Sequence, residues 1–298
     1  MFILGAMRTM KPHIKLLICS TFLLFGNQLY AQTDSTRFVH ANWTIRKIAK
    51  GIVLKQLNIA DSSLFKANQV ISMLDIKLKR RYQLAVGYEP SERKLTSTFG
   101  KEAKAIAAIN GTFFDVKNGG SVDFLKVDGI VINENCKEAN GKRAMHQKAA
   151  ITIDGKKINI LNWDGTASWE HSLKASTVML TGPLLLQNYQ QVKLDSSAFN
   201  KTRHPRAAFA IGKNKHIILL TVDGRDSHSA GMDLFELSSI FRWMKTKDAI
   251  NLDGGGSTTL WVNGESENGV VNFPSDNKVW DHQGERPVAN VLLLRKRK

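Results

Sequence analysis

The stretch Ala249-Ile250-Asn251-Leu252-Asp253-Gly254-Gly255-Gly256-Ser257 gives the clearest indication of fold and function in this chain. Residues 249–252 are mostly apolar and are typical of a short buried strand. The three glycines that follow are costly to order unless the backbone must approach a ligand closely or adopt positive φ. Their amides, together with the Ser257 hydroxyl, are expected to form a concave site for an anion. Taken alone, the stretch fits a plain glycine-rich bend between two strands equally well.

Strand-length apolar segments lie on both sides of this loop. Residues 149–153 and 158–161 flank Asp154-Gly155, a pattern typical of a hairpin with a type I′ turn. One helix is expected to begin after Asp233, because Glu236 stands three residues later, as in a capping box. We therefore predict an α+β fold: a single domain with a mixed, mostly antiparallel sheet, few helices, and an active site on loops at strand ends.

The N-terminus is typical of a signal peptide spanning residues 1–31. Basic residues precede the apolar run 16–25, and Ala31 offers a small residue at the expected cleavage point. The protein is therefore expected to be exported, to the periplasm or the extracellular space. Lipidation at Cys19 is not expected, because Ile18 precedes it where lipoprotein signals carry a small residue. We expect residues 32–66 to be a polar lead-in and residues 67–298 to be the functional domain.

The overall charge narrows the kinds of partner that are expected. The formal net charge is +16, with 42 Lys+Arg against 26 Asp+Glu, so anionic partners are favoured. Nucleic acid is not expected as a partner, because the basic residues are spread along an exported chain. No uninterrupted apolar run approaches about 18 residues, so no transmembrane segment is expected. The oligomeric state is left open.

Other strand-length segments also end in polar turns that contain glycine. These turns are Asn110-Gly111-Thr112, His204-Pro205-Arg206 and Asp223-Gly224-Arg225. Each one alone is more typical of an ordinary turn than of a site. A sheet that brings several such turns to one edge makes a site of convergent polar groups, so the combination favours an active site. The serine-hydrolase elbow and the zinc-protease helix motif are both missing from the sequence.

The same segments, in this order, resemble the phosphodiester glycosidase family. The resemblance covers roughly residues 70–294 and is most specific from Arg206 to Gly264. It rests on the segments 110–114, 181–183, 205–212, 223–225, 231–237 and 249–257. It implies an exported hydrolase that cleaves a sugar-1-phosphodiester, similar to an α-N-acetylglucosaminyl phosphodiester, at the anomeric carbon. The implied partner is a phosphorylated sugar or glycan.

This resemblance and the chemistry of glycoside cleavage suggest a role for each polar residue. Cleavage passes through an oxocarbenium-like state and normally uses two carboxylates. Asp253 is expected to be the nucleophile or the base that activates water, with Asp223 or Glu285 as the second carboxylate. Guanidinium groups bind phosphate in a bidentate manner. Phosphate and sugar are therefore expected to be held by Asn110, Gly111, Arg206, Arg225, Asn251, Gly254, Gly255, Gly256 and Ser257.

Three further possibilities stay open at this point. No cofactor is expected, although a divalent cation at Asp223 and Asp253 is conceivable, because hard cations prefer oxygen ligands. The chain could be a non-catalytic binder of an acidic or phosphorylated glycan. It could also process exopolysaccharide or another envelope polymer, and an extended groove with exposed aromatic side chains is then expected. The candidates for such side chains are Trp163, Trp169 and Trp280.

Overall fold

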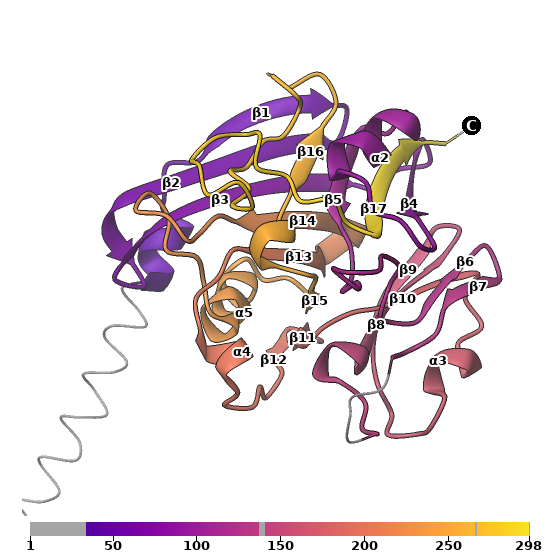
Figure 1. The fold of residues 1–298 in the computed structure, drawn as a ribbon. Helices are drawn as coiled ribbons and strands as arrows, with labels where there is room; N and C mark the ends of the chain where they lie inside the picture. The colour runs from indigo at the N-terminus through magenta and orange to yellow at the C-terminus, as the bar shows by residue number, and fades with distance from the viewer. Residues whose placement is uncertain (1–33, 137–140, 266, 298) are drawn as a thin grey trace, which may run out of the picture.

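The computed structural model describes residues 34–136, 141–265 and 267–297 (Figure 1). The predicted signal peptide, residues 1–31, lies outside the described residues. Within the part of the chain that is described, no helix is long and apolar enough to cross a membrane.

The largest element of the fold is an antiparallel sheet of eight strands (Figure 1). It contains residues that were expected to be a lead-in, since residues 44–64 form its first two strands. The domain boundary predicted at residue 67 therefore falls inside a pair of hydrogen-bonded strands. The strand order is β1 (Thr44–Ala49), β2 (Ile52–Leu64), β3 (Ala67–Lys77), β14 (His216–Val222), β13 (Arg206–Ile211), β15 (Asp248–Asn251), β11 (Leu184–Gln187) and β12 (Gln190–Gln191).

Two smaller sheets pack beside it, and their strands are also antiparallel. The hairpin predicted around Asp154-Gly155 is confirmed, because β8 and β9 pair from Ala149↔Asn162 to Asp154↔Lys157. The α+β class with mostly antiparallel sheet is confirmed as well. The five-stranded sheet has the order β7 (Ile130–Asn133), β6 (Leu125–Val127), β10 (Thr177–Leu180), β8 (Ala149–Asp154) and β9 (Lys157–Asn162), and the four-stranded sheet has the order β16 (Leu260–Val262), β5 (Ala107–Asn110), β17 (Asn290–Lys296) and β4 (Tyr82–Tyr88).

Strand alternation divides the large sheet into two buried faces. On β3, Leu74 and Ile76 point to a core shared with the two smaller sheets. Their neighbours Ile71 and Met73 point to the opposite face, where a second core includes residues of helix α5 (Leu234–Trp243). Because successive side chains of a strand point to opposite faces, one strand contributes to both cores. The large sheet is therefore the central layer of the molecule.

Helices are few, as predicted. Asp233 caps α5, its carboxylate accepting the Glu236 amide while the Glu236 carboxylate accepts the Asp233 amide. Residues 34–39 are also helical, α2 (Thr96–Glu102) is a short helix, and α3 (Trp169–Ser172) and α4 (Ala198–Lys201) are single turns. Trp169 on α3 is only 4% exposed and belongs to a buried cluster, so it is not the exposed sugar platform that the polymer-processing interpretation expected.

Candidate active site

Antiparallel pairing brings three of the predicted turns together at one end of the central strands of the large sheet. Strand β13 begins at Arg206, which pairs with Val222 at the end of β14, and Ala208 pairs with Asn251 at the end of β15. The start of β13 therefore lies beside the ends of β14 and β15. This register brings Pro205-Arg206, the turn after Val222 and the glycine loop after Asn251 together.

The end of β5 is hydrogen-bonded to these turns through the backbone of Asp253. The Asp253 amide donates to the Gly111 carbonyl at 2.9 Å, and the Asn110 side-chain amide donates to the Asp253 carbonyl at 2.6 Å. The other side-chain atom of Asn110 accepts the Thr259 amide at 3.1 Å. Asn110 was expected to bind a sugar hydroxyl, but both ends of its buried side chain are used to hold the glycine loop.

Asn251 is likewise directed into the protein. It is fully buried, and its side-chain amide donates to the carbonyls of Gly182 at 2.9 Å and Leu252 at 2.6 Å. These bonds tie the end of β15 to the Gly182-Pro183 turn, whose carbonyl at Pro183 accepts the Asn251 amide. Its predicted contact with a sugar is therefore not supported by its position, and we assign it a positioning role.

The glycine loop does not form the expected nest of free amides. The Gly254 amide donates to the carboxylate of the preceding residue, Asp253, at 2.9 Å. The Gly255 amide donates to the Pro205 carbonyl at 2.8 Å. The Ser257 amide donates to Gly254, which closes a short 3₁₀ turn over Gly255–Ser257. The amides of Gly254, Gly255 and Ser257 thus already donate hydrogen bonds within the protein. Hydrogen bonds to phosphate, which these amides were expected to donate, must therefore come from other groups.

Two guanidinium groups lie against these glycines instead. A Cβ on Gly255, which has φ +59°, would lie 2.9 Å from the Arg225 guanidinium, and one on Gly256 would lie 2.5 Å from that of Arg286. The absence of side chains therefore lets two cations approach the loop backbone. Arg225 itself adopts φ +65°, an uncommon backbone conformation for a residue with a side chain. Asp276 holds Arg286 through its Nε at 2.7 Å.

These groups surround a cavity of about 260 Å³. Asp253 is the carboxylate of its lining, and three arginines contribute to the same wall. Such a site combines one nucleophilic or basic oxygen with several groups that bind an anion. The lining residues are Phe199, His204, Arg206, Arg225, Asp253, Gly254, Gly255, Gly256 and Arg286.

Burial raises the pKa of Asp253 to about 6. The Ser257 hydroxyl, the Gly254 amide and the charge of Arg286 oppose this rise, while the buried Asp123 carboxylate adds to it. A carboxylate with a pKa near 6 is still mostly ionised at neutral pH, yet it is more basic than an ordinary aspartate. Such a value is typical of catalytic carboxyl groups.

Arg206 and His204 contribute to the cavity in different ways. The Arg206 guanidinium is buried and donates to the backbone carbonyls of Met232, Phe199 and Thr202 at 2.8–2.9 Å. Burial lowers the pKa of Arg206 to about 10, so it stays charged at neutral pH, but most of its donors are already engaged. Burial, followed by the charges of Arg206 and Arg225, lowers the pKa of His204, so this imidazole is neutral near pH 7.

Sequence reasoning missed a His–Asp pair beside this cavity. His146 Nδ1 lies 2.7 Å from an oxygen of the fully buried Asp123, whose other oxygen accepts the Thr112 hydroxyl at 2.5 Å. The His146 ring stacks on Phe113, which in turn contacts Phe199 of the cavity wall. These residues form no recognisable motif, because Asp123 and His146 lie 23 positions apart in the chain.

The two residues predicted as second carboxylates are not among the residues that line this cavity. Asp223 is fully buried, and one oxygen accepts both the Asn272 side-chain amide and the Phe273 amide at 2.9 Å. Glu285 is 9% exposed and accepts the Ser97 amide at 2.9 Å, which places its carboxylate at the first turn of α2. Both carboxylates therefore act as hydrogen-bond acceptors within the fold.

The neighbour of Glu285 is the residue that reaches the cavity. Arg286, which the sequence analysis did not include among the binding residues, lies over Gly256 and takes part in the wall. Its position next to Glu285 gave no signal of this role. Among the described residues, no three His, Cys, Asp or Glu side chains cluster as ligands for a metal ion, and the open question of a cation at Asp223 and Asp253 gains no support.

A second cavity of about 350 Å³ adjoins the first and shares Arg225 and Arg286 with it. Trp280, one of the predicted sugar platforms, contributes to its wall together with Phe273. The two rings stack at 4.2 Å with an interplanar angle of 6°, and the His228 ring also stacks on Trp280 at 4.9 Å. Arg225 and Arg286 therefore line both the cavity at Asp253 and the cavity at Trp280, which also contains Asp226 and Asp276.

The site therefore combines one buried carboxylate with several guanidinium groups, two of which also line a cavity that contains aromatic side chains. A family model described as phosphodiester glycosidase matches residues 103–295. The chain therefore belongs to the phosphodiester glycosidase family, and the resemblance noted in the sequence is confirmed.

Similar proteins include enzymes and uncharacterised relatives. The chain is 24% identical to mouse N-acetylglucosamine-1-phosphodiester alpha-N-acetylglucosaminidase over 57% of its length, and 34% identical to the prophage-derived protein YomE of Bacillus subtilis over 60%. The matched segments cover only 33% and 28% of those relatives, so the chain corresponds to about a third of each.

Solved structures share the fold. The catalytic domain of the zebrafish N-acetylglucosamine-1-phosphodiester alpha-N-acetylglucosaminidase, solved in a form auto-inhibited by its pro-peptide, matches 86% of this chain and 88% of that one, with a TM-score of 0.63 and 18% identity. A hypothetical protein from Synechocystis matches 86% of this chain and 64% of that one, with a TM-score of 0.61 and 15% identity.

Proposed function

We propose that this protein is an exported hydrolase that cleaves a sugar-1-phosphodiester between the anomeric carbon and the phosphate. The observation that carries the proposal is the placement of Asp253 in one cavity with the guanidinium groups of Arg206, Arg225 and Arg286. Membership of the phosphodiester glycosidase family supports it. The predicted signal peptide, residues 1–31, supports export.

The chemistry divides between the carboxylate and the arginines. The bond from the anomeric carbon to the phosphate oxygen breaks, and its electron pair stays on the phosphate. Asp253 either attacks the anomeric carbon directly or takes a proton from the attacking water. A phosphate monoester is a weak base, so it leaves without the strong general acid that an alcohol requires. Arg225 and Arg286 stabilise its charge by hydrogen bonds to its oxygens.

A second proton-transfer group is assigned to an imidazole rather than to Asp223 or Glu285. His204 lines the cavity and is neutral near pH 7, so it is able to accept a proton from water. His146, held by Asp123, is the other candidate and lies behind Phe113. Replacing each with alanine separately distinguishes them, because only the acting residue changes the pH profile of kcat.

The adjoining aromatic cavity favours a substrate that continues beyond the phosphate. The arginines shared by both cavities place the phosphate at their junction, with the sugar beside Asp253 and the ester group beside Trp280. Phe273 and Trp280 add apolar surface to this cavity and its charged side chains add hydrogen-bond partners, a mixture that suits a second sugar. A phosphodiester within an exopolysaccharide or another envelope glycan fits this arrangement.

The experiment compares two chromogenic substrates of one sugar, α-N-acetylglucosamine first: the 1-phosphodiester and the plain glycoside. Turnover of the phosphodiester alone is expected. Asp253→Asn is expected to lower its kcat on the order of a thousandfold or more, as for other nucleophiles and bases. The matched control is Asp61→Asn, an exposed aspartate on β2 outside the lining of both cavities, which is expected to keep normal activity. Cleavage of the plain glycoside alone, or an active Asp253→Asn variant, contradicts the proposal.

A further inference from the structure

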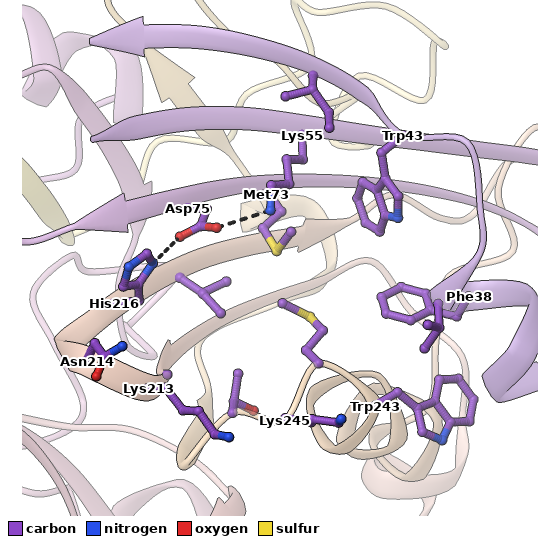
Figure 2. Close-up of a pocket in the computed structure, with 16 residues that line it drawn as sticks. Phe38, Trp43, Lys55, Met73, Asp75, Lys213, Asn214, His216, Trp243 and Lys245 are labelled. Atoms are coloured by element: carbon purple, nitrogen blue, oxygen red, sulfur yellow. Dashed lines mark hydrogen bonds and ion pairs between the residues drawn. The ribbon is translucent and has the colours of Figure 1, made fainter. Parts of the chain in front are cut away.

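A larger cavity, of about 560 Å³, is drawn in Figure 2 and shares no lining residue with the cavity at Asp253. Its lining includes His216, the first residue of β14, whereas the turn after Val222 at the end of β14 lies near Asp253. The larger cavity opens on the face of the sheet that α5 covers. On β2, β3 and β14 the residues that face it are Lys55, Met73 and His216. Helix α5 ends at Trp243, and the cavity lies between this end of the helix and the three strands.

One side of the cavity is an apolar wall built from separate parts of the chain. Phe38 contacts Trp43 edge-on at 5.6 Å and Trp243 at 5.9 Å, so the three rings form one cluster. Met73 and Met244 add flexible thioether side chains, which adapt to irregular apolar ligands. Figure 2 shows the three aromatic rings together at one side of the cavity.

The apolar surface continues to the cavity mouth. Val39 and Ile45 also line the cavity, and they are 55% and 62% exposed. Large apolar side chains exposed beside a partly apolar hollow are typical of a ligand site rather than of an ordinary surface. The volume also falls within the range of cavities that hold small organic ligands, roughly 300–1,000 Å³.

The other side of the cavity is positively charged. Asp75 accepts the Lys55 ammonium at 3.1 Å and lies 2.9 Å from His216 Nδ1, so its charge is already balanced within the wall (Figure 2). Lys213 and Lys245 are exposed, and neither forms an ion pair with a carboxylate in the described part of the chain. The polar edge therefore presents uncompensated positive charge next to the apolar wall.

We propose that this cavity binds a long-chain amphiphile with one anionic head group, such as a fatty acid. The alkyl chain lies against the Phe38, Trp43 and Trp243 rings, and the carboxylate lies near Lys213 and Lys245. The same lysines repel a cationic amphiphile. The aromatic and thioether wall offers few hydrogen-bond partners to a glycan, so neither ligand is expected to bind well. The site is separate from the proposed hydrolytic site, so it does not depend on that activity.

The test uses calorimetric titration of the purified protein with dodecanoate below its micelle concentration. Saturable binding of one molecule per chain is expected, without a change in near-ultraviolet circular dichroism that signals unfolding. Decanoate, which is two methylenes shorter, is expected to bind roughly fifteenfold more weakly, because each buried methylene strengthens binding about fourfold. Dodecyltrimethylammonium is the charge-reversed probe, and no saturable binding of it is expected.

Two double variants separate a specific head-group site from general attraction to a basic protein. Lys213→Glu with Lys245→Glu is expected to weaken dodecanoate binding by about tenfold or more, while phosphodiester hydrolysis stays unchanged. Lys157→Glu with Lys174→Glu makes the same change in net charge at exposed positions on and beside the five-stranded sheet, outside the cavity lining, and is expected to leave binding intact.

Several results overturn the proposal. They are an absence of saturable dodecanoate binding, equal binding of the cationic amphiphile, and an equal loss of affinity in both double variants. If a polyuronic oligosaccharide binds at this cavity and dodecanoate does not, the ligand is an acidic glycan and the amphiphile proposal is wrong. Met244→Trp provides an independent check, because its larger ring fills the cavity and is expected to lower dodecanoate affinity without altering the lysines.

Discussion

Asp223→Asn separates a structural role of this carboxylate from a catalytic one. Asp223 is fully buried, and burial raises its pKa from 3.8 to about 7 against two hydrogen bonds that lower it. One oxygen accepts the Asn272 side chain and the Phe273 amide. The side-chain oxygen of an asparagine is able to accept both bonds, so the variant removes the charge and leaves the observed contacts in place.

The magnitude follows from proton linkage. The Asp223 carboxyl group binds its proton more tightly in the folded protein than in the unfolded chain. The stability that the protonated carboxyl group contributes is therefore fully present below about pH 3.8. It is lost as the pH rises through about 7. The difference between the two pKa values corresponds to about 4 kcal/mol of unfolding free energy. The new buried amide leaves its own donors without partners, which costs about 1–3 kcal/mol at every pH.

The assay is urea unfolding of both proteins between pH 5 and pH 8. Between pH 5 and pH 8 wild type is expected to lose about 2–3 kcal/mol more stability than Asp223→Asn, and the variant is expected to be the more stable protein at pH 8. Asp61→Asn is the control, because hydrogen bonds from Ser63 lower the pKa of Asp61 and it stays ionised throughout this range. Its pH dependence is expected to follow wild type.

Two results refute this reasoning. Parallel stability curves for wild type and Asp223→Asn show that burial of the charge carries no penalty at this position. A folded Asp223→Asn protein whose kcat falls about a thousandfold shows that Asp223 acts on the substrate, as the sequence analysis had suggested. Retention of at least a third of the wild-type kcat is the result expected from its hydrogen bonds within the fold.

Three further predictions concern the site. Because the pKa of Asp253 is about 6 and its ionised form reacts, kcat/KM for the phosphodiester is expected to rise with pH through about 6 and then level off, whereas a profile that falls there contradicts this role. Gly256→Ala places a methyl group 2.5 Å from the Arg286 guanidinium, so KM is expected to rise about tenfold; an unchanged KM excludes Arg286 from binding. Glu285→Gln keeps an acceptor for the Ser97 amide and removes a charge that burial disfavours, since burial raises the pKa of Glu285, so stability in urea unfolding is expected to change by less than about 1 kcal/mol with kcat unchanged; a loss of kcat restores Glu285 as a catalytic candidate.

Part of the fold is readable from local sequence. The hairpin over residues 149–162 and the capped helix α5 were predicted, because turn type and helix capping depend on residues close together in the chain. The glycine loop after β15 was also identified as a site element. Residues 44–64 were expected to belong to a polar lead-in, and the structure places two full strands there. Their partners are set by pairing within the large sheet, which no local pattern specifies.

The same contrast holds for the site. The sequence by itself determined that Asp253 and Arg225 follow strand ends beside glycines, and therefore that they are candidates for one polar edge. Only the tertiary structure decided which neighbours reach the cavity: Arg286 lines it, whereas the adjacent Glu285 reaches the first turn of α2. The physical reason is that a side chain's partner is fixed by contacts between distant segments, and residues next to each other in the chain can point to opposite sides.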